Sequence, residues 1–341
     1  MKDLKIYEHP GVFELDSGAI IDRLNIGYHT FGTLNEDKSN VVWVCHALTA
    51  NSNVPEWWGG LVGPDGLISP DEYFIVCANV LGSCYGSTNP LSENVNGEPY
   101  LLDFPLFTMR DIVNAHLLLK DHLGIGEIYL CMGGSCGGQQ VLEMALLNSD
   151  RIHNLFIIAA SARETSWSIA IHTAQRMSIE ADGSWGQGGK EAAAEGLKAA
   201  RGIGLLTYRS FRAYIDTQTD ENDKTNDLKA ESYIRYQGQK LADRFNAYSY
   251  WYLTKALDTH HVGRGRGSVE SALSSIAART LVIGIDSDIL IPFSEQELIA
   301  EHIPGSNLVK LETAYGHDGF LIEQEKIRAE LEKFLHLPHG F

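Results

Sequence analysis

Long apolar runs are missing from this sequence. No run of apolar residues approaches the length of about 18 that a membrane-spanning helix needs, and the first five residues lack the apolar core of a signal peptide. We therefore expect a cytoplasmic protein that has no membrane partner.

Basic residues are also scarce. Lysine and arginine together number 27, against 44 aspartates and glutamates, which gives a formal net charge of −17. Nucleic acids and anionic membrane surfaces repel such a chain, so neither is expected as a partner. An anionic substrate must therefore be held by cations placed locally around its site.

Cysteine pairs with metal-binding or redox spacing are absent. The five cysteines are Cys45, Cys77, Cys84, Cys131 and Cys136, and no two of them form a C-x-x-C motif. Their number is odd and all lie in the first 136 residues. Buried, reduced thiols are therefore expected rather than disulfides, and no metal site is predicted.

The apolar runs that are present have the length of buried strands. They occupy residues 41–45, 74–78, 128–130, 155–159, 280–285 and 308–311, and helical patterns at 108–123, 139–147 and 294–302 lie between them. Shorter strands at 12–15 and 24–28 are expected to be antiparallel. Strands that alternate with helices predict an α/β fold with a mostly parallel sheet and helices on both faces.

No strand pattern is evident between Arg163 and about Ala278, where helical patterns dominate. We predict that residues 163–278 form a helical lid inserted over the carboxyl edge of the sheet. Residues 1–162 and 279–341 would then form one core domain.

The most informative stretch is Cys131-Met132-Gly133-Gly134-Ser135-Cys136-Gly137-Gly138. It follows an apolar strand and precedes a helical pattern, which is the setting of a G-x-S-x-G nucleophile elbow. Its glycines allow a sharp turn, and the following helix offers free N–H groups to an anionic intermediate. Ser135 is therefore the candidate nucleophile.

A serine nucleophile needs a base, and the base needs an orienting carboxylate. In α/β-hydrolase chains the order is Ser, Asp or Glu, then His, each just after a strand. Asp288 and His317 fit this order, and Asp286 is the alternative carboxylate. Other histidines, such as His46, do not follow a late strand.

The oxyanion hole of such a site uses two backbone N–H groups. One belongs to the residue after the nucleophile, here Cys136, and the other to the loop after the strand at 41–45. We predict Leu48 for the second donor, with Ala47 as the alternative. A catalytic role for the Cys136 thiol is the less favoured hypothesis, and the backbone donor role is preferred.

Motifs spread over nearly the whole chain resemble those of the homoserine O-acetyltransferases, a family of the α/β-hydrolase superfamily. Besides the elbow, the matching segments are His46-Ala47-Leu48-Thr49, Trp57-Trp58, Asn79-Val80-Leu81-Gly82, Asp103-Phe104-Pro105, Leu206-Thr207-Tyr208-Arg209-Ser210, Ser249-Tyr250-Trp251-Tyr252-Leu253, Ser287-Asp288 and Tyr315-Gly316-His317-Asp318-Gly319-Phe320-Leu321.

This resemblance implies acetyl transfer from acetyl-CoA to the hydroxyl of L-homoserine, by a ping-pong route through an acyl-serine, in methionine biosynthesis. It implies a homodimer joined through the lid and no cofactor beyond acetyl-CoA as co-substrate. It also implies that a lid arginine and the aspartate after the catalytic histidine bind the amino acid. Asp318 matches the aspartate, and Arg201 matches the arginine, with Arg209 as a close rival.

The chain departs from the family pattern at Cys136 and Gln140, where the family usually has methionine. Succinyl-CoA as donor, serine as acceptor, and a serine esterase or thioesterase on the same triad are the alternative functions. We also expect lid aromatics to line a dry channel, namely Trp167, Tyr208, Tyr250, Trp251 and Tyr252.

Overall fold

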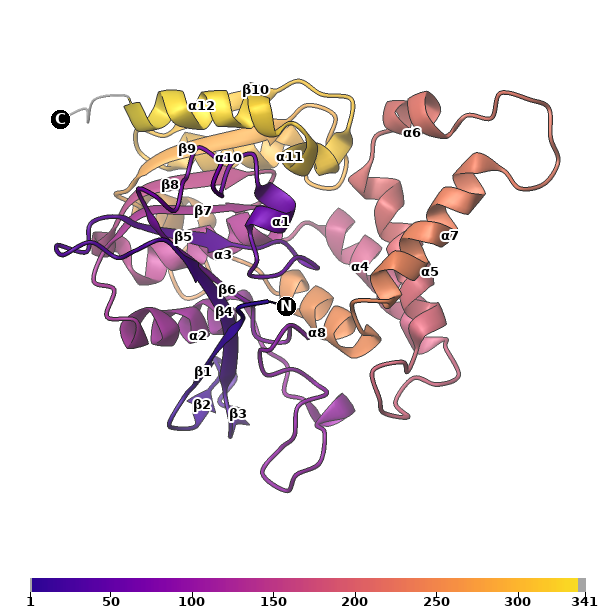
Figure 1. Ribbon diagram of the computed structural model, residues 1–341, viewed down its shortest axis with the longest axis horizontal. Helices are drawn as coiled ribbons and strands as arrows, with labels where there is room; N and C mark the ends of the chain where they lie inside the picture. The colour runs from indigo at the N-terminus through magenta and orange to yellow at the C-terminus, as the bar shows by residue number, and fades with distance from the viewer. Residues whose placement is uncertain (1, 337–341) are drawn as a thin grey trace.

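The computed structural model describes residues 2–336, and an eight-stranded sheet runs through its centre (Figure 1). In sheet order the strands are β1 (Lys5–Glu8), β4 (Asn25–Phe31), β6 (Phe74–Ala78), β5 (Val41–Cys45), β7 (Ile128–Gly134), β8 (Ile152–Ile158), β9 (Arg279–Ile285) and β10 (Asn307–Leu311). From β6 to β10 all neighbours are parallel, whereas β4 pairs antiparallel with β1 and β6. This confirms the predicted α/β fold class.

Each face of the sheet carries its own apolar core. Along β5, Val41, Trp43 and Cys45 contribute to one core, and Val42 and Val44 contribute to the other. A strand buried on both faces requires this continuous apolar run, because successive side chains point to opposite sides.

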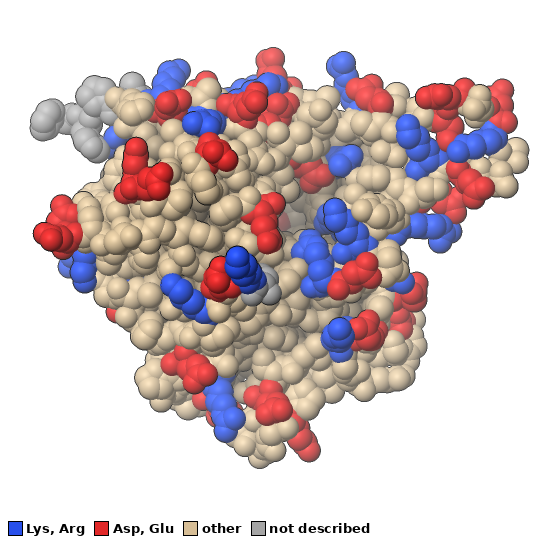
Figure 2. All heavy atoms as spheres, viewed as in Figure 1, with Lys and Arg blue, Asp and Glu red and all other residues tan. Residues whose placement is uncertain are grey.

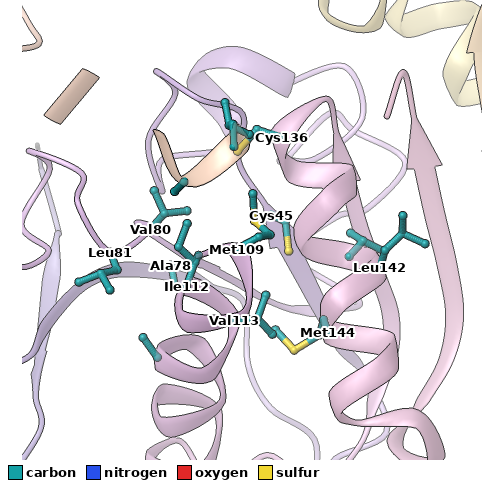
Figure 3. Packing of buried hydrophobic residues seen from close by; sticks show 14 of the residues in the cluster. Cys45, Ala78, Val80, Leu81, Met109, Ile112, Val113, Cys136, Leu142 and Met144 are labelled. Carbon is teal, nitrogen blue, oxygen red and sulfur yellow. The ribbon is translucent and has the colours of Figure 1, made fainter. Parts of the chain in front are cut away.

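The first core lies under α2 (Met109–His122), α3 (Cys136–Leu147) and α10 (Phe293–His302). Figure 3 shows Val113 of α2 and Met144 of α3 pointing toward one another in this core. The helix α2 begins where the sequence indicates, because Thr108 and Asp111 form a capping box at its first turn.

The second core lies under α1 (Pro55–Trp58), α11 (Gly319–Ile322) and α12 (Gln324–His336). Single turns of 3₁₀-helix lie at η1 (Leu101–Asp103), η2 (Ser149–Arg151) and η3 (Gly316–Asp318). A small separate hairpin pairs β2 (Phe13–Glu14) with β3 (Ile20–Ile21).

The described segment between β8 and β9 is helical. It holds α4 (Ser166–Glu180), α5 (Ala194–Tyr208), α6 (Phe211–Gln218), α7 (Lys229–Ala242), α8 (Ala247–Asp258) and α9 (Val269–Ser274). Helix α5 packs against both α4 and α7, and Figure 1 shows these helices to the right of the sheet. The predicted division into a core domain and a lid domain stays a prediction.

Several elements differ from the sequence prediction, and for two of them, β1 and α3, the physical reason is clear. The edge strand β1 was not predicted, because four residues with one buried side chain give little apolar signal. Helix α3 begins at Cys136, three residues before the predicted start at Gln139. Its first turn was not predicted because Gly137 and Gly138 have low helix propensity.

All five cysteines are free thiols, and none of the described residues forms a disulfide. Among residues 2–336, no helix has both the length and the apolar character that crossing a membrane requires.

Candidate active site

Ser135 lies at a sharp turn between the end of β7 and the start of α3. Its backbone has φ 56° and ψ −127°, a region that residues with a Cβ rarely adopt. The backbone after the turn passes so close to β5 that a Cβ built on Gly137 would clash with the carbonyl oxygen of Cys45. Only glycine fits at that position.

Ser135, His317 and Asp288 form one hydrogen-bonded chain. The Ser135 Oγ lies 2.8 Å from Nε2 of His317, and Nδ1 of His317 lies 2.6 Å from Oδ2 of Asp288. The serine follows β7, the aspartate follows β9, and the histidine lies in η3 after β10. Since the carboxyl ends of these parallel strands share one edge of the sheet, residues far apart in sequence meet there.

The carboxylate of Asp288 is held from behind by backbone. Its Oδ1 accepts hydrogen bonds from the N–H groups of Leu290 at 2.8 Å and Ile291 at 2.9 Å, which leaves Oδ2 for the histidine. The alternative, Asp286, is exposed and instead accepts from the N–H of Thr313. The geometry therefore favours Asp288 over Asp286 as the partner of the histidine.

The environment of His317 favours its protonated form. Burial lowers the pKa of the imidazole, but the charge and hydrogen bond of Asp288 outweigh this effect, so the net shift of the pKa is upward. The same aspartate fixes the ring with its proton on Nδ1, which leaves Nε2 to accept a proton from Ser135.

Backbone N–H groups of residues that line the cavity are candidates for the oxyanion donors. Cys136 is the first residue of α3, so its N–H has no acceptor within the helix. Within residues 2–336, the N–H groups of Leu48 and of the alternative donor, Ala47, both donate to no protein acceptor. Cys136, Leu48 and Ala47 all line the same cavity as Ser135.

The Cys136 thiol is poorly suited to nucleophilic chemistry. Its side chain is buried, and burial raises the pKa of the thiol to about 12. Because the thiolate is the nucleophilic form of cysteine, this thiol is unreactive at neutral pH.

A cavity of about 500 Å³ opens above Ser135, between the sheet edge and the helices α4, α5, α7 and α8. Figure 2 shows the corresponding hollow, with Lys and Arg atoms on its right side. All the predicted site residues except Asp288 line this cavity: Leu48, Ser135, Cys136, Arg201, His317 and Asp318. Asp288 lies behind His317, as an orienting group must.

The two candidate arginines occupy different places. Arg201 lines the cavity, and its guanidinium carbon lies 5.3 Å from the centre of the Tyr208 ring. Arg209 does not line it, and its Nε lies 3.3 Å from Oδ2 of Asp318. Arg201 is therefore open to a ligand, whereas Arg209 holds the carboxylate of Asp318 in place.

Asp318 is a partly exposed carboxylate next to the catalytic candidates. Burial raises its pKa, although the charges of Arg201 and Arg209 oppose this shift. An ammonium group bound beside Asp318 would favour its charged form further.

Sequence reasoning missed several polar residues of the cavity wall. Glu164 lines the cavity and accepts a hydrogen bond of 2.7 Å from Nε2 of Gln139. Gln139 lies on α3, one helical turn after Ser135. Lys240, on α7, and Arg244, two residues beyond the end of α7, also line the cavity. Their i, i+4 spacing in the sequence was the available signal, because such a spacing in a helix brings two cations together.

The expected aromatic channel is only partly present. Tyr208 lines the cavity, but the other four residues do not: Trp167, Tyr250, Trp251 and Tyr252. Two of them are directed elsewhere, since the indole of Trp251 donates to Glu180 and the hydroxyl of Tyr252 to the carbonyl of Leu102.

Comparison with known proteins places this arrangement in context. A family model described as the alpha/beta hydrolase fold matches residues 40–324. The chain is 47% identical over 321 residues to the homoserine O-acetyltransferase of Cyclobacterium marinum, a match that covers 94% of this chain and 92% of that protein.

Two solved structures share the fold. The crystal structure of homoserine O-acetyltransferase from Bacillus anthracis superimposes with a TM-score of 0.91 and 24% identity over the whole of both chains. Esterase E22 superimposes with a TM-score of 0.89 and 24% identity, covering 98% of this chain and 99% of that one.

Proposed function

The chain belongs to the homoserine O-acetyltransferase family of the α/β hydrolases, and we propose that it transfers an acetyl group from acetyl-CoA to the hydroxyl of L-homoserine. The observation that carries this proposal is the hydrogen-bonded chain of Ser135, His317 and Asp288, which ends in a cavity large enough for two reactants in turn.

In the first half-reaction, neutral His317 takes the proton of Ser135 while Oγ attacks the thioester carbonyl. The N–H groups of Leu48 and Cys136 stabilise the oxyanion that forms. Collapse of this intermediate breaks the carbon–sulfur bond, His317 returns the proton to the sulfur, and CoA leaves. An acetyl ester on Ser135 remains.

In the second half-reaction, the homoserine hydroxyl attacks the acetyl ester. His317 accepts the hydroxyl proton, the bond between the acetyl carbon and Oγ of Ser135 breaks, and His317 gives the proton to that Oγ. Arg201 pairs with the carboxylate of the amino acid and Asp318 with its ammonium group, and these two contacts orient the hydroxyl. The product is O-acetylhomoserine, a methionine precursor, and no cofactor takes part beyond the co-substrate.

The charges of the cavity wall support this choice of donor. Lys240 and Arg244 are positive in a chain of net charge −17 and line the cavity, where the phosphates of CoA can approach them. Glu164 lines the same cavity as Ser135, and its charge contributes to raising the pKa of His317. A carboxylate there disfavours a succinyl chain, which itself ends in a carboxylate, and tolerates acetyl.

The helical segment also supports a homodimer. Large apolar side chains on and next to α5, α6 and α7 are exposed, namely Leu206, Phe211, Ile215 and Tyr236. Exposed apolar groups gathered in this way are typical of an association surface. The mass measured by light scattering distinguishes a dimer from a monomer.

The defining experiment measures CoA release with a thiol reagent. We expect slow release from acetyl-CoA alone and release at least about tenfold faster when homoserine is added, because a bound hydroxyl has a much higher effective concentration than bulk water. Double-reciprocal plots for the two substrates should be parallel, as a ping-pong route requires. The matched control is Ser135→Ala, which should remain folded and release no CoA.

Three other results would replace the proposal. Fast release that no amino acid accelerates would identify a thioesterase or esterase. Acceleration by serine instead of homoserine would change the acceptor. Activity with succinyl-CoA alone would change the donor and contradict the role given to Glu164.

A further inference from the structure

The two predicted oxyanion donors lie on separate segments of the chain. Cys136 begins α3, whereas Leu48 belongs to the loop that follows β5. An oxyanion hole works only when both N–H groups point at the same oxygen position, with donor distances near 2.7–3.1 Å. The relative placement of these two segments therefore decides whether the site is assembled.

One side chain, Gln140, bonds to both segments. It is fully buried on α3, and its Nε2 donates to the carbonyl of His46 at 3.0 Å and to the carbonyl of Cys136 at 3.2 Å. The first acceptor lies two residues before Leu48. The second belongs to the residue that supplies the other donor.

The loop is fixed from its other side by the imidazole of His46. This ring is fully buried, its Nε2 accepts from the N–H of Val80 at 3.1 Å, and its Nδ1 lies 2.8 Å from the carbonyl of Ala47. Because a peptide N–H can only donate, Nδ1 carries the ring proton. Burial lowers the pKa of His46 to about 4, so this arrangement persists at neutral pH.

One polar atom of Gln140, the buried Oε1, has no hydrogen-bond partner among the described residues. Leaving a buried amide oxygen unpaired is costly. An apolar side chain, which the resemblance leads one to expect at this position, would avoid that cost, so the donor end of the amide is what the position uses.

We infer that Gln140 is a positioning residue that aligns the Leu48 and Cys136 N–H groups into one oxyanion hole. This inference rests on the proposed function only in assuming that Ser135 is acylated. It does not depend on which amino acid accepts the acyl group.

The test replaces the amide by a side chain of similar volume. Gln140→Met removes the N–H donor and keeps the space filled. Deleting an oxyanion donor outright costs about 10²–10³ in kcat. Misplacing one should cost less, and we expect kcat to fall about tenfold, with the KM values for acetyl-CoA and homoserine nearly unchanged.

A matched control is available in Gln296. It is also fully buried, donates from Nε2 to the carbonyl of Ala160 at 2.8 Å and leaves its Oε1 unpaired, but it lies on α10 away from the loop after β5. Gln296→Met should shift the melting temperature by about as much as Gln140→Met does, and it should leave kcat unchanged. Gln140→Asn keeps an amide that is too short to reach the His46 carbonyl, and it serves if the Met variant does not fold.

Two further measurements isolate the oxyanion hole. A small alkylboronic acid forms a tetrahedral adduct on the serine, so its affinity should fall about tenfold in Gln140→Met, while the affinity for CoA stays unchanged. The rate of acylation by p-nitrophenyl acetate should fall in parallel. If the wild type is acylated normally but does not respond to homoserine, the proposed acceptor is wrong. The acylation rate of Gln140→Met would then still show whether Gln140 positions the oxyanion donors.

Unchanged kcat and unchanged boronate affinity in Gln140→Met would overturn the inference. An equal loss of kcat in Gln296→Met would also overturn it, because the effect would then come from core packing.

Discussion

Replacing Asp288 by asparagine tests the hydrogen-bonded chain at the member that has a fully buried side chain. In the protein, Oδ1 of Asp288 accepts two backbone N–H groups and Oδ2 accepts the Nδ1 proton of His317. An asparagine must keep its oxygen toward the two backbone donors, since its NH₂ group cannot accept from them. Its NH₂ group then faces Nδ1 of the histidine.

That arrangement changes which ring nitrogen of His317 carries the proton. A donor facing Nδ1 requires the ring proton to move to Nε2, and Nε2 can then no longer accept the proton of Ser135. In serine proteases the equivalent change lowers kcat by about 10⁴, which corresponds to about 5 kcal/mol of transition-state stabilisation. We expect a loss of the same order in Asp288→Asn, with little change in KM, because Asp288 does not line the cavity.

The assay is CoA release at saturating acetyl-CoA and homoserine, together with thermal unfolding to show that the variant is folded. Asp286→Asn is the control, because that side chain is exposed and its oxygen can still accept from Thr313. It should change kcat by less than about twofold, because Asp286 belongs neither to the hydrogen-bonded chain nor to the cavity lining. If Asp286→Asn is the more damaging of the two, or if Asp288→Asn keeps more than a tenth of the activity, the assignment of the carboxylate is wrong.

Two further predictions concern pH and the amino acid site. Because the pKa of His317 is raised above 6.5 and its neutral form is the base, kcat/KM should fall as pH drops through a value above 6.5, and a profile flat from pH 5 to 8 would exclude this base. The raised pKa of His317 also stabilises the folded protein at low pH, and this stabilisation is lost as the pH rises through the folded-state pKa. The contribution of His317 to the free energy of unfolding should therefore decrease over the pH range in which kcat/KM increases. Arg201→Ala should raise KM for homoserine about tenfold or more without changing KM for acetyl-CoA, as expected for loss of a charge-assisted pair. Arg209→Ala should act less strongly, through Asp318, and the reverse ranking would give the binding role to Arg209.

The parallel part of the sheet was predictable from the sequence because its strands are buried on both faces. Runs such as Val41–Cys45 carry no polar residue and admit few other interpretations. The edge strand Lys5–Glu8 was not predictable, because only one of its side chains is buried and pairing with β4 supplies its stability.

The candidate site divides in the same way. Ser135, Asp288 and His317 follow strand ends, so chain order and topology predict that they meet. The cavity wall depends on how separate helices approach one another, and no local pattern encodes this. The sequence marks Gln140 only as a departure from the family pattern, so its contacts and those of Glu164 were found from the hydrogen bonds of the structure. The choice between Arg201 and Arg209 required the cavity itself.

The strained backbone of Ser135 lowers the stability of the protein at the residue that its activity requires. A non-glycine residue held at φ 56° and ψ −127° carries roughly 1–3 kcal/mol of strain, which a protein of ordinary stability must absorb elsewhere in its fold. Ser135→Gly would release that strain and remove the nucleophile in the same step. A library of variants screened for heat resistance alone is therefore expected to enrich this inactivating change. The serine persists only where selection also measures turnover.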